Sequence, residues 1–587
     1  MRAPTRVERW LGRSPRWLRL VLAAPTVVLG AVLLVRPTTS LGVLALLIGA
    51  GLVLHGVVDL VGGRVGGAAA RWRRLVAVLW VGAGLVVLLL PGLTVRLLTV
   101  VVGVGLLVHG GSLLVGALRR GAPADERGAD GAFGAASVVF GVLALGWPDI
   151  TALVVAVVFG ARLVAAGLVL GWMTLRRPRE PARRRRRRWT RTVAAVASVA
   201  LAAASAAVSV ALNDGSTVTD AFYAPPRDVP DSPGELVRAE RTTRGVPVGA
   251  QGWRILYTTT RGDGSPAVAS GLVVVPAAGE GPWPVVDWNH GTTGVAQHCA
   301  PSLADEPFES GALMILPEVL AEGWALVATD YIGLGTQGPH PYLIGPDSAH
   351  ASLDAVRAAQ ALEGADLAEE TVVWGHSQGG GAALWTGALL DEYAPDLAVA
   401  GVAALAPASD LRGLVSGLDD VPGGSVLASF VASAYTAEYD DVTYRRYVRP
   451  GAEVVVREMA ERCLAPPGVL VSVLTALALS REPTILAADP STGGFGDRLA
   501  QNEPPTTVPV PLLIGQGGAD RLITPGVQRG FVDRLCAAGV TVDYRQYPGR
   551  DHLALVEPDS PLVPELLGWT RDRFAGAPTA AGCPAGR

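Results

Sequence analysis

The sequence of 587 residues contains no lysine, so all 49 of its basic residues are arginines. Acidic residues are scarce in the first part of the chain, where residues 1–212 hold 26 arginines and only 7 Asp or Glu. Residues 213–587 hold 23 arginines and 45 acidic residues. The net charge of −3 is therefore the sum of a basic part and an acidic part. The acidic part lacks the positive surface that nucleic-acid binding requires, so we expect no nucleic-acid partner.

Cysteine is also absent from residues 1–212. The four cysteines all lie in the acidic part, at Cys299, Cys463, Cys536 and Cys583. An even number confined to one region indicates disulfides in a compartment that permits them, and four cysteines allow three pairings. The spacing of histidines and cysteines indicates no metal site.

A glycine-flanked serine carries the strongest chemical signal in the chain. The motif G-x-S-x-G spans residues 375–379 with Ser377 at its centre. A short apolar run, Thr371–Trp374, precedes it, and a small-residue run of helical character, Ala382–Leu390, follows it. In this strand–turn–helix context the motif predicts an exposed nucleophilic serine. The glycines allow a sharp turn and leave space beside the hydroxyl.

The partners of such a serine are expected in the chain order Ser, acid, His. Residues 508–514 predict a buried strand, and the Gly-rich loop after it carries Asp520. Residues 540–547 predict a second strand, and the loop after it carries His552, the only histidine after Ser377. Loops at strand ends are where a rigid sheet presents catalytic groups. We therefore predict a catalytic triad of Ser377, Asp520 and His552.

Three other aspartates compete with Asp520 for the acid position. Asp489 and Asp497 do not follow a predicted buried strand. Asp551 adjoins His552 in the chain and would be badly placed to hold its ring. A turn aspartate and a surface histidine remain the alternative interpretation of Asp520 and His552.

A polar loop after another predicted strand completes the predicted site. Residues 284–289 predict a strand that runs into the sequence HGTTG at 290–294. In hydrolases with an HGGG-type loop, backbone N–H groups of that loop and of the residue after the nucleophile form the oxyanion hole. We predict that Thr292, Thr293 and Gln378 supply these N–H groups. An ordinary polar turn is the alternative.

Five segments together resemble the secretory lipase family: Asn289–Gly294, Cys299–Ser302, Asp330–Gly335, His340–Leu343 and the motif at 375–379. The resemblance covers about residues 220–583. It implies an α/β-hydrolase fold with a helical cap, a triad at the three positions above, and carboxylic ester hydrolysis without a cofactor. It also implies the disulfide pairs Cys299–Cys463 and Cys536–Cys583.

The chain between Ser377 and Asp520 is far longer than one or two strand–helix connections need. Helical periodicity occurs at Glu453–Cys463 and Val469–Leu479, with little strand pattern. We predict a helical cap at about 408–505, which would suit a lipid-facing lid. A purely structural subdomain is the alternative.

Apolar runs fill the basic part, at about 18–35, 41–61, 75–90, 94–118, 132–147, 149–175 and 190–212. Several are long enough to span a bilayer, which takes about 20 residues. From Pro37, Pro91 and Pro148, small residues or histidine recur at the same three offsets: Gly49, His55, Gly56; Gly103, His109, Gly110; Gly160, Ala166, Gly167. This repeat resembles the HdeD-like family and predicts six spans in three helical hairpins that pack closely through small residues.

Arginines are concentrated in alternate loops. They precede the first run and follow the second, fourth and sixth, and the last group includes Arg183–Arg188. The positive-inside rule then predicts a cytoplasmic N-terminus and an extracytoplasmic acidic part. Between two apolar runs, Arg183–Arg188 is better interpreted as a cytoplasmic anchor than as a nucleic-acid site. No cleavable signal peptide is evident, so we expect the spans to deliver the exported part.

The predicted fold is a transmembrane helical region of about seven spans followed by an α/β-hydrolase with a helical cap. The predicted parts are a six-span domain at 1–175, a basic loop and seventh span at 176–212, a linker at 213–235 and the hydrolase at 236–587. The predicted function is hydrolysis of carboxylic lipid esters at the cell membrane, with an ester substrate and the bilayer as partners. The alternatives are an acyltransferase on cell-envelope lipids, a membrane protein with a degenerate hydrolase and, more weakly, a peptidase.

Overall fold

The computed structural model describes residues 16–61, 68–118, 124–175, 185–213, 219–464, 468–479 and 484–578, together with Cys583. The chain divides into two compact units. The first, which we call the helical unit, combines the described helices up to Asn213 with two later segments, Val448–Glu458 and Leu474–Ile485. The second, which we call the sheet unit, contains the other described residues.

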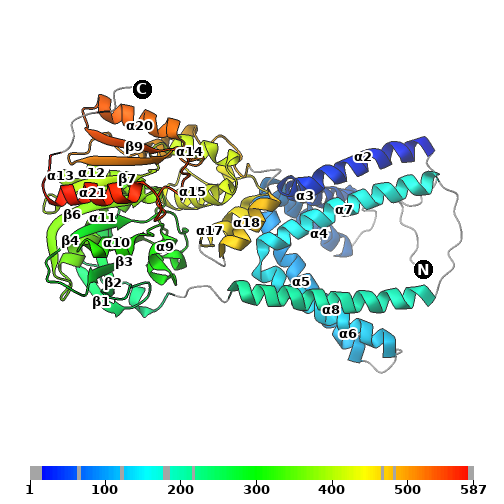
Figure 1. The fold of residues 1–587 in the computed structure, drawn as a ribbon. Coiled ribbons are helices and arrows are strands. Elements are labelled where there is room, and N and C mark those ends of the chain that lie inside the picture. Colours follow the sequence, from blue (N-terminus) through cyan, green and yellow to red (C-terminus); the bar gives the residue numbers. More distant parts are fainter. Residues whose placement is uncertain are drawn as a thin grey trace. The chain divides into compact units, whose positions relative to one another are not determined.

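Seven helices open the described part of the helical unit (Figure 1): α2 (Arg16–Val35), α3 (Pro37–Val61), α4 (Ala68–Leu89), α5 (Pro91–Leu118), α6 (Ala124–Gly146), α7 (Pro148–Leu175) and α8 (Arg185–Asn213). They confirm the predicted N-terminal helical region. Helices α3, α5 and α7 each begin at the proline that starts a repeat. Proline suits this position because the first residue of a helix has no use for its backbone N–H.

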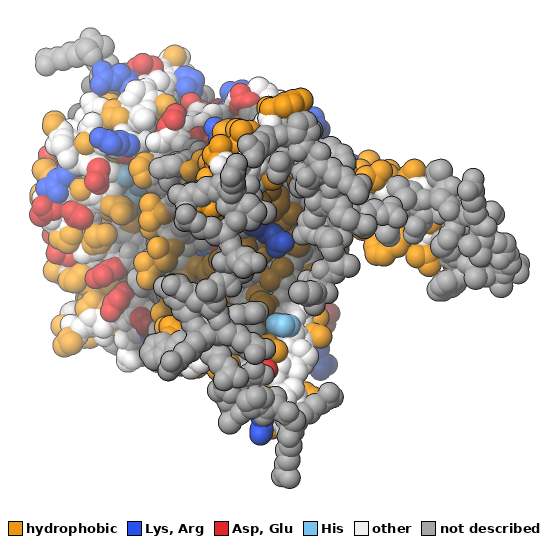
Figure 2. Space-filling model, turned by 90° about the vertical axis from the view of Figure 1, so that its right-hand side faces the viewer, with side chains coloured by type: hydrophobic (Ala, Val, Ile, Leu, Met, Phe, Trp, Pro, Cys, Tyr) orange, Lys and Arg blue, Asp and Glu red, His pale blue; other side chains and the backbone are white. Residues whose placement is uncertain are grey.

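Four described helices contain a stretch that is long and apolar enough to cross a membrane: Gly92–Leu118, Arg127–Gly146, Pro148–Trp172 and Thr192–Val210. Shorter apolar stretches occur at Ala23–Val35, Thr38–Leu54 and Leu75–Leu89. Large hydrophobic side chains such as Val101, Val108 and Leu168 are exposed, and Figure 2 shows exposed hydrophobic side chains in orange. Apolar surface of this extent indicates a membrane-associated part. The count of seven spans stays a prediction.

Glycines of the repeat lie where helices pack most closely, in the pairs α3 with α4, α5 with α6 and α2 with α7. A Cβ on Gly49 would lie 2.8 Å from a side-chain carbon of α4, and one on Gly103 would lie 2.7 Å from a side-chain carbon of α6. A Cβ on Gly160 would lie 3.0 Å from a backbone nitrogen of α2. The predicted close packing at these positions is confirmed.

The arrangement of six spans in three hairpins stays a prediction. Two of the close pairs are consecutive helices, but the third joins the first and the sixth helix, α2 and α7. The spacing of small residues identifies the face along which a helix makes close contact. It carries no information about which other helix fills that face.

Nine strands form one sheet in the sheet unit, in the order β1-β2-β3-β5-β4-β6-β7-β8-β9. Their bounds are β1 Leu236–Thr242, β2 Ala250–Thr260, β3 Pro266–Pro276, β4 Trp283–Asn289, β5 Ala325–Ile332, β6 Leu367–His376, β7 Ala398–Leu405, β8 Leu512–Gly517 and β9 Val542–Tyr547. The pairs among β1, β2, β3 and β5 are antiparallel. The remaining pairs are parallel. Strands β5 and β8 are buried along their whole length, as expected for strands covered on both faces.

Helices cover both faces of this sheet (Figure 1). One face packs against α11 (Gly345–Gln360), α12 (Gln378–Ala388) and α20 (Pro525–Ala537). The other packs against α9 (Pro307–Ser310), α10 (Leu316–Ala321) and α21 (Leu562–Phe574). Side chains of β6 alternate between the two, so Val373 joins the α12 side and Trp374 the α21 side. The predicted α/β sandwich is confirmed.

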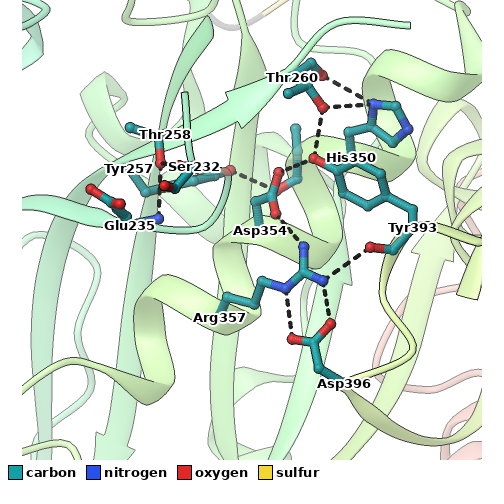
Figure 3. Close-up of polar contacts among 11 residues, drawn as sticks. Ser232, Glu235, Tyr257, Thr258, Thr260, His350, Asp354, Arg357, Tyr393 and Asp396 are labelled. Carbon is teal, nitrogen blue, oxygen red and sulfur yellow. Dashed lines mark hydrogen bonds and ion pairs between the residues drawn. The ribbon is translucent and has the colours of Figure 1, made fainter. Parts of the chain in front are cut away.

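A polar network ties α11 to its neighbours (Figure 3). The hydroxyl of Tyr393, in the short helix α13 (Leu390–Tyr393), donates to Asp354 at 2.6 Å and lies 2.7 Å from the Thr260 hydroxyl of β2. Arg357 of α11 pairs with Asp354 and with Asp396. These contacts join an early strand, α11 and the chain after α13, so we interpret the network as a structural clamp.

The chain between β7 and β8 is helical where the cap is predicted. Its described helices are α14 (Leu411–Gly417), η4 (Leu418–Asp420), α15 (Gly424–Glu438), α16 (Tyr444–Tyr447), α17 (Glu453–Ala460), α18 (Gly468–Ala478) and α19 (Gly493–Gln501). Within the sheet unit, α15 packs on the loop after β5. The Phe430 ring meets the Tyr342 ring edge to face, and the Tyr435 hydroxyl donates to the carbonyl of Leu343 at 3.2 Å.

Part of the segment predicted as a linker, 213–235, is packed. Phe222 and Tyr223 are only 3% and 1% exposed and belong to a cluster with Leu256 of β2. Arg254 forms an ion pair with Asp220 at 2.8 Å. The polar composition of the segment concealed these two aromatic anchors.

Candidate active site

Ser377 occupies the sharp turn between β6, which ends at His376, and α12, which begins at Gln378. Its φ of +58° lies in the left-handed region, where a side chain costs conformational energy that the surrounding structure must offset. A Cβ on Gly375 would lie 1.9 Å from the carbonyl oxygen of Gly379. Only glycine therefore fits there, and the strand–turn–helix geometry is that of a nucleophile elbow.

The other two residues of the predicted triad meet Ser377 from the ends of the last strands. His552, in the loop after β9, has its Nε2 2.8 Å from Ser377 Oγ and its Nδ1 2.7 Å from Asp520 Oδ2. Asp520 follows β8, and its other oxygen accepts from the backbone N–H groups of Leu522 and Ile523 at 2.8 and 2.9 Å. The three side chains thus form one hydrogen-bonded chain. The competing Asp551 is exposed, and its Oδ1 accepts from the Ala554 N–H in its own turn.

His376, inside the motif itself, is a residue that the sequence interpretation missed. Its Nε2–H donates to the backbone carbonyl of His552 at 3.0 Å, and the two rings lie 4.8 Å apart. Burial, with the repulsion of a charged His552, lowers the pKa of His376 to about 3. It is therefore neutral near pH 7 and can hold the His552 backbone without adding charge. Its place beside Ser377 was a signal, but its partner lies far away in the sequence.

The predicted oxyanion loop lies directly beside the elbow. A Cβ on Gly379 would lie 1.9 Å from the carbonyl oxygen of Asn289, the last residue of β4. The structure therefore brings the start of the loop with Thr292 and Thr293 close to Gln378. The hydroxyl of Thr293 donates to the Cys299 carbonyl at 2.9 Å, and that of Thr292 lies 2.9 Å from the Tyr342 hydroxyl. These contacts fix the loop from both sides.

A second buried histidine orients the side chain of Gln378. His340 Nδ1–H donates to the Ile332 carbonyl at 2.9 Å, which leaves Nε2 as the acceptor for the Gln378 amide at 3.2 Å. Burial lowers the pKa of His340 to about 3, so the ring keeps this acceptor near pH 7. Sequence reasoning used the His340–Leu343 segment only as a family marker. The contact gives it a physical role, because it holds the residue after the nucleophile.

Two buried carboxylates, on β4 and β5, tie these strands to neighbouring segments. Asp287 of β4 accepts from the hydroxyl of Ser352 in α11, and burial raises its pKa to about 7. Asp330 of β5 accepts from the Ser302 N–H at 2.9 Å and from the Ser270 hydroxyl at 2.6 Å, and burial raises its pKa as well. Asp330 therefore anchors the Cys299–Ser302 segment. Neither carboxylate lies in the hydrogen-bonded chain of Ser377.

Disulfides join Cys299 to Cys463 and Cys536 to Cys583, the pairing that the resemblance implies. The first ties the segment after the oxyanion loop to the helical insertion, and the Leu464 N–H donates to the Thr293 carbonyl at 2.8 Å. His298 lies with Cys299 and Cys463 in a group whose side-chain ligand atoms are within 4.8 Å of one another. Both sulfur atoms are used in the disulfide, so this group does not offer thiolate ligands to a metal ion.

The family comparisons agree with this arrangement. Residues 310–582 match the secretory lipase family. Residues 21–81, 75–129 and 132–206 match a short repeat of unknown function, DUF308, in agreement with the internal repeat found in the sequence.

Individual relatives match the C-terminal part. A Mycobacterium tuberculosis protein named a probable inactive lipase is 28% identical over 389 residues, 61% of this chain and 82% of the relative. Lipase A of Arthroderma benhamiae is 24% identical over 393 residues, 62% of this chain and 81% of its own. The closed-state structure of Candida antarctica lipase A has a TM-score of 0.52 at 21% identity and covers 62% of this chain and 88% of its own, which shows the fold. The C-terminal part of the chain thus has an α/β-hydrolase fold and matches the secretory lipase family over residues 310–582, and the N-terminal part matches DUF308 repeats.

Proposed function

We propose that this protein is a membrane-anchored serine hydrolase whose sheet unit lies outside the cytoplasm and cleaves carboxylic esters of lipids. The observation that carries the proposal is the continuous hydrogen-bonded chain from Ser377 through His552 to Asp520 at a nucleophile elbow. The lipase names of several relatives support lipid esters as the substrate class.

The geometry supports the following mechanism. His552 Nε2 takes the proton of Ser377 as Oγ attacks the ester carbonyl carbon, and Asp520 holds the ring and stabilises the imidazolium. Backbone N–H groups of Gln378 and of Thr292 or Thr293 would bind the oxyanion. Collapse of the tetrahedral intermediate breaks the ester C–O bond, and His552 returns its proton to the leaving alcohol. Water, deprotonated by His552, then attacks the acyl-enzyme, and His552 returns that proton to Ser377 Oγ as the bond from Oγ to the acyl carbon breaks and the acid leaves.

A fluorophosphonate probe on the full-length protein in membranes tests the nucleophile. We expect covalent labelling that maps to Ser377 and is lost in Ser377→Ala. Equal labelling of the variant would rule out Ser377. A wild-type protein that is neither labelled nor active on a panel of lipid esters would assign it to the inactive class that the name of one relative describes. A labelled acyl donor then distinguishes hydrolysis, which yields free acid, from transfer, which yields a new ester.

The arginine pattern supports an extracytoplasmic sheet unit, with the N-terminus in the cytoplasm. Protease added to intact spheroplasts should therefore cleave the sheet unit while leaving cytoplasmic marker proteins whole. Cleavage that occurs only after lysis would contradict this orientation.

A further inference from the structure

Two segments of the helical insertion belong to the helical unit and not to the sheet unit. Residues Val448–Glu458 and Leu474–Ile485 are separated in sequence but tied together, since the Arg449 N–H donates to the Ile485 carbonyl at 3.0 Å. Val454, at the start of α17, is 3% exposed. It packs in a cluster with buried residues of the three proline-started helices: Leu41 and Ala45 of α3, Val95 of α5, and Ala152 and Ala156 of α7.

The contacts fall at the same position of each repeat, the residue directly after the proline. In α3, the Thr38 carbonyl oxygen would lie 2.0 Å from a Cβ on Gly451. In α5, a Cβ on Gly92 would lie 2.1 Å from a carboxylate oxygen of Glu453. In α7, Asp149 accepts from the Thr475 hydroxyl at 3.2 Å. Three equivalent positions thus contact the insertion, and opposite Thr38 the insertion itself has no room for a side chain at Gly451.

Helix α18, which carries Thr475, has two different sides. Val471, Ser472 and Thr475 are at most 2% exposed, whereas Leu470, Val473, Leu474 and Leu477 are 53%, 44%, 56% and 62% exposed. The exposed four follow the spacing i, i+3, i+4, i+7 of a single helix face. No charged residue lies within Gly468–Ala478. We call this exposed face the α18 stripe.

We propose that α18 is a membrane-contacting element and that the α18 stripe contacts lipid acyl chains. Its bond to the first turn of α7, and the contacts of residues 451–454 with α3 and α5, hold it at the bilayer surface. Two observations identify lipid as the occupant. The same helix bonds to Asp149, the second residue of the candidate span Pro148–Trp172, so α18 lies at a membrane-span end. A continuous apolar face on a helix without charges is also poorly suited to water.

The membrane position of the spans rests on the proposed function, but the contact of the insertion with the three repeats does not. In the proposed topology the first turns of α3, α5 and α7 lie at the extracytoplasmic ends of these helices. The three repeats would then hold the segments Val448–Glu458 and Leu474–Ile485 of the helical unit at the membrane surface.

The contact can be tested by thiol cross-linking in membranes holding the full-length protein. Asp149→Cys with Thr475→Cys should be joined by a short bifunctional thiol reagent. The matched control, Asp149→Cys with Leu477→Cys, places the second thiol on the opposite side of the same helix and should give no cross-link. Equal cross-linking of the two pairs, or cross-linking of neither pair, would refute the contact between α18 and the first turn of α7.

Lipid contact can be tested with a fluorophore on Leu477→Cys in liposomes that contain nitroxide-labelled phospholipids. Quenching is expected there and not on Asp572→Cys, an exposed position of α21. Equal quenching at both positions, or none at 477, would refute lipid contact by the α18 stripe. Mapping of the two native disulfides reports folding of every variant. Neither readout uses catalysis, so a protein in which Ser377 proves unreactive can still support or refute this proposal.

Discussion

The two units are stabilised in opposite ways. In the helical unit, the same contact recurs three times, because Gly49, Gly103 and Gly160 each let one helix approach another. In the sheet unit, buried polar groups are paired individually, as Asp520 is with His552 and Asp330 with Ser302. In the helical unit, stabilisation is spread over equivalent positions. In the sheet unit, it depends on single pairs of residues. We therefore expect mutational damage to be graded in the helical unit and abrupt in the sheet unit.

In the sheet unit, the largest loss of activity from a single substitution is expected at Asp520. Asp520→Asn would let the loop N–H groups keep their acceptor but would present an amide N–H to His552, which favours the wrong tautomer. By analogy with serine proteases, kcat should fall by about 10⁴. The measurement is ester turnover normalised to folded protein. Asp551→Asn is the matched control because Asp551 is adjacent to His552 but caps its own turn, and an equal loss there would reassign the acid.

The pH dependence of stability should report the ionisation of the buried Asp287. Its folded-state pKa of about 7 exceeds the ordinary value of 3.8, so its contribution to stability is present below about pH 4 and lost as the pH rises through 7. Asp287→Asn cannot ionise, so its stability relative to wild type should rise by up to about 1.4 kcal/mol per pH unit between pH 4 and 7.

Urea titration with limited proteolysis of the full-length protein in membranes measures this difference. The substitution Gly160→Leu in the helical unit adds no titratable group and serves as the reference. A pH-independent difference between Asp287→Asn and wild type would show that Asp287 does not titrate in the folded state over this range.

The disulfide Cys299–Cys463 provides a cross-link that the described helices up to Asn213 lack, since that part contains no cysteine. Replacing both cysteines with serine should lower the stability of the sheet unit by about 2–4 kcal/mol. The expected readout is a lower urea midpoint for proteolysis of the sheet unit, with the Cys536–Cys583 bond still present. An unchanged midpoint would mean that the surrounding contacts hold the loop without the bond.

In the helical unit, substitution of a single glycine of the repeat should cause only a partial loss of stability. Gly160→Leu should weaken the pair α2 with α7 by about 1–3 kcal/mol through overpacking, while the equivalent contacts at Gly49 and Gly103 persist. Gly51→Leu is the matched control because no atom lies within 4 Å of a Cβ built there. Thermal aggregation of the protein in detergent compares the two. A complete loss of folded protein in Gly160→Leu alone would refute graded damage in this unit.

Much of the fold and the geometry of the triad could be predicted because local sequence carries them. The glycines around Ser377 encode the turn, and the strand patterns before Asp520 and His552 encode the edge of the sheet at which both appear. His376 and Asp287 were missed because their roles depend on His552 and Ser352, residues brought near only by folding. The partner of α7 was missed for the same reason, since the spacing of small residues describes one helix and not its neighbour.

The position of His552 late in the sequence determines when the candidate site is completed during synthesis. The base sits after β9, the last strand of the sheet, whereas the nucleophile lies 175 residues earlier. A ribosome makes the helices first, then the elbow, and only near the end the loop that activates it. In the proposed mechanism, a growing chain therefore carries a serine without its base, and the site is complete only once the final strand has docked at the sheet edge.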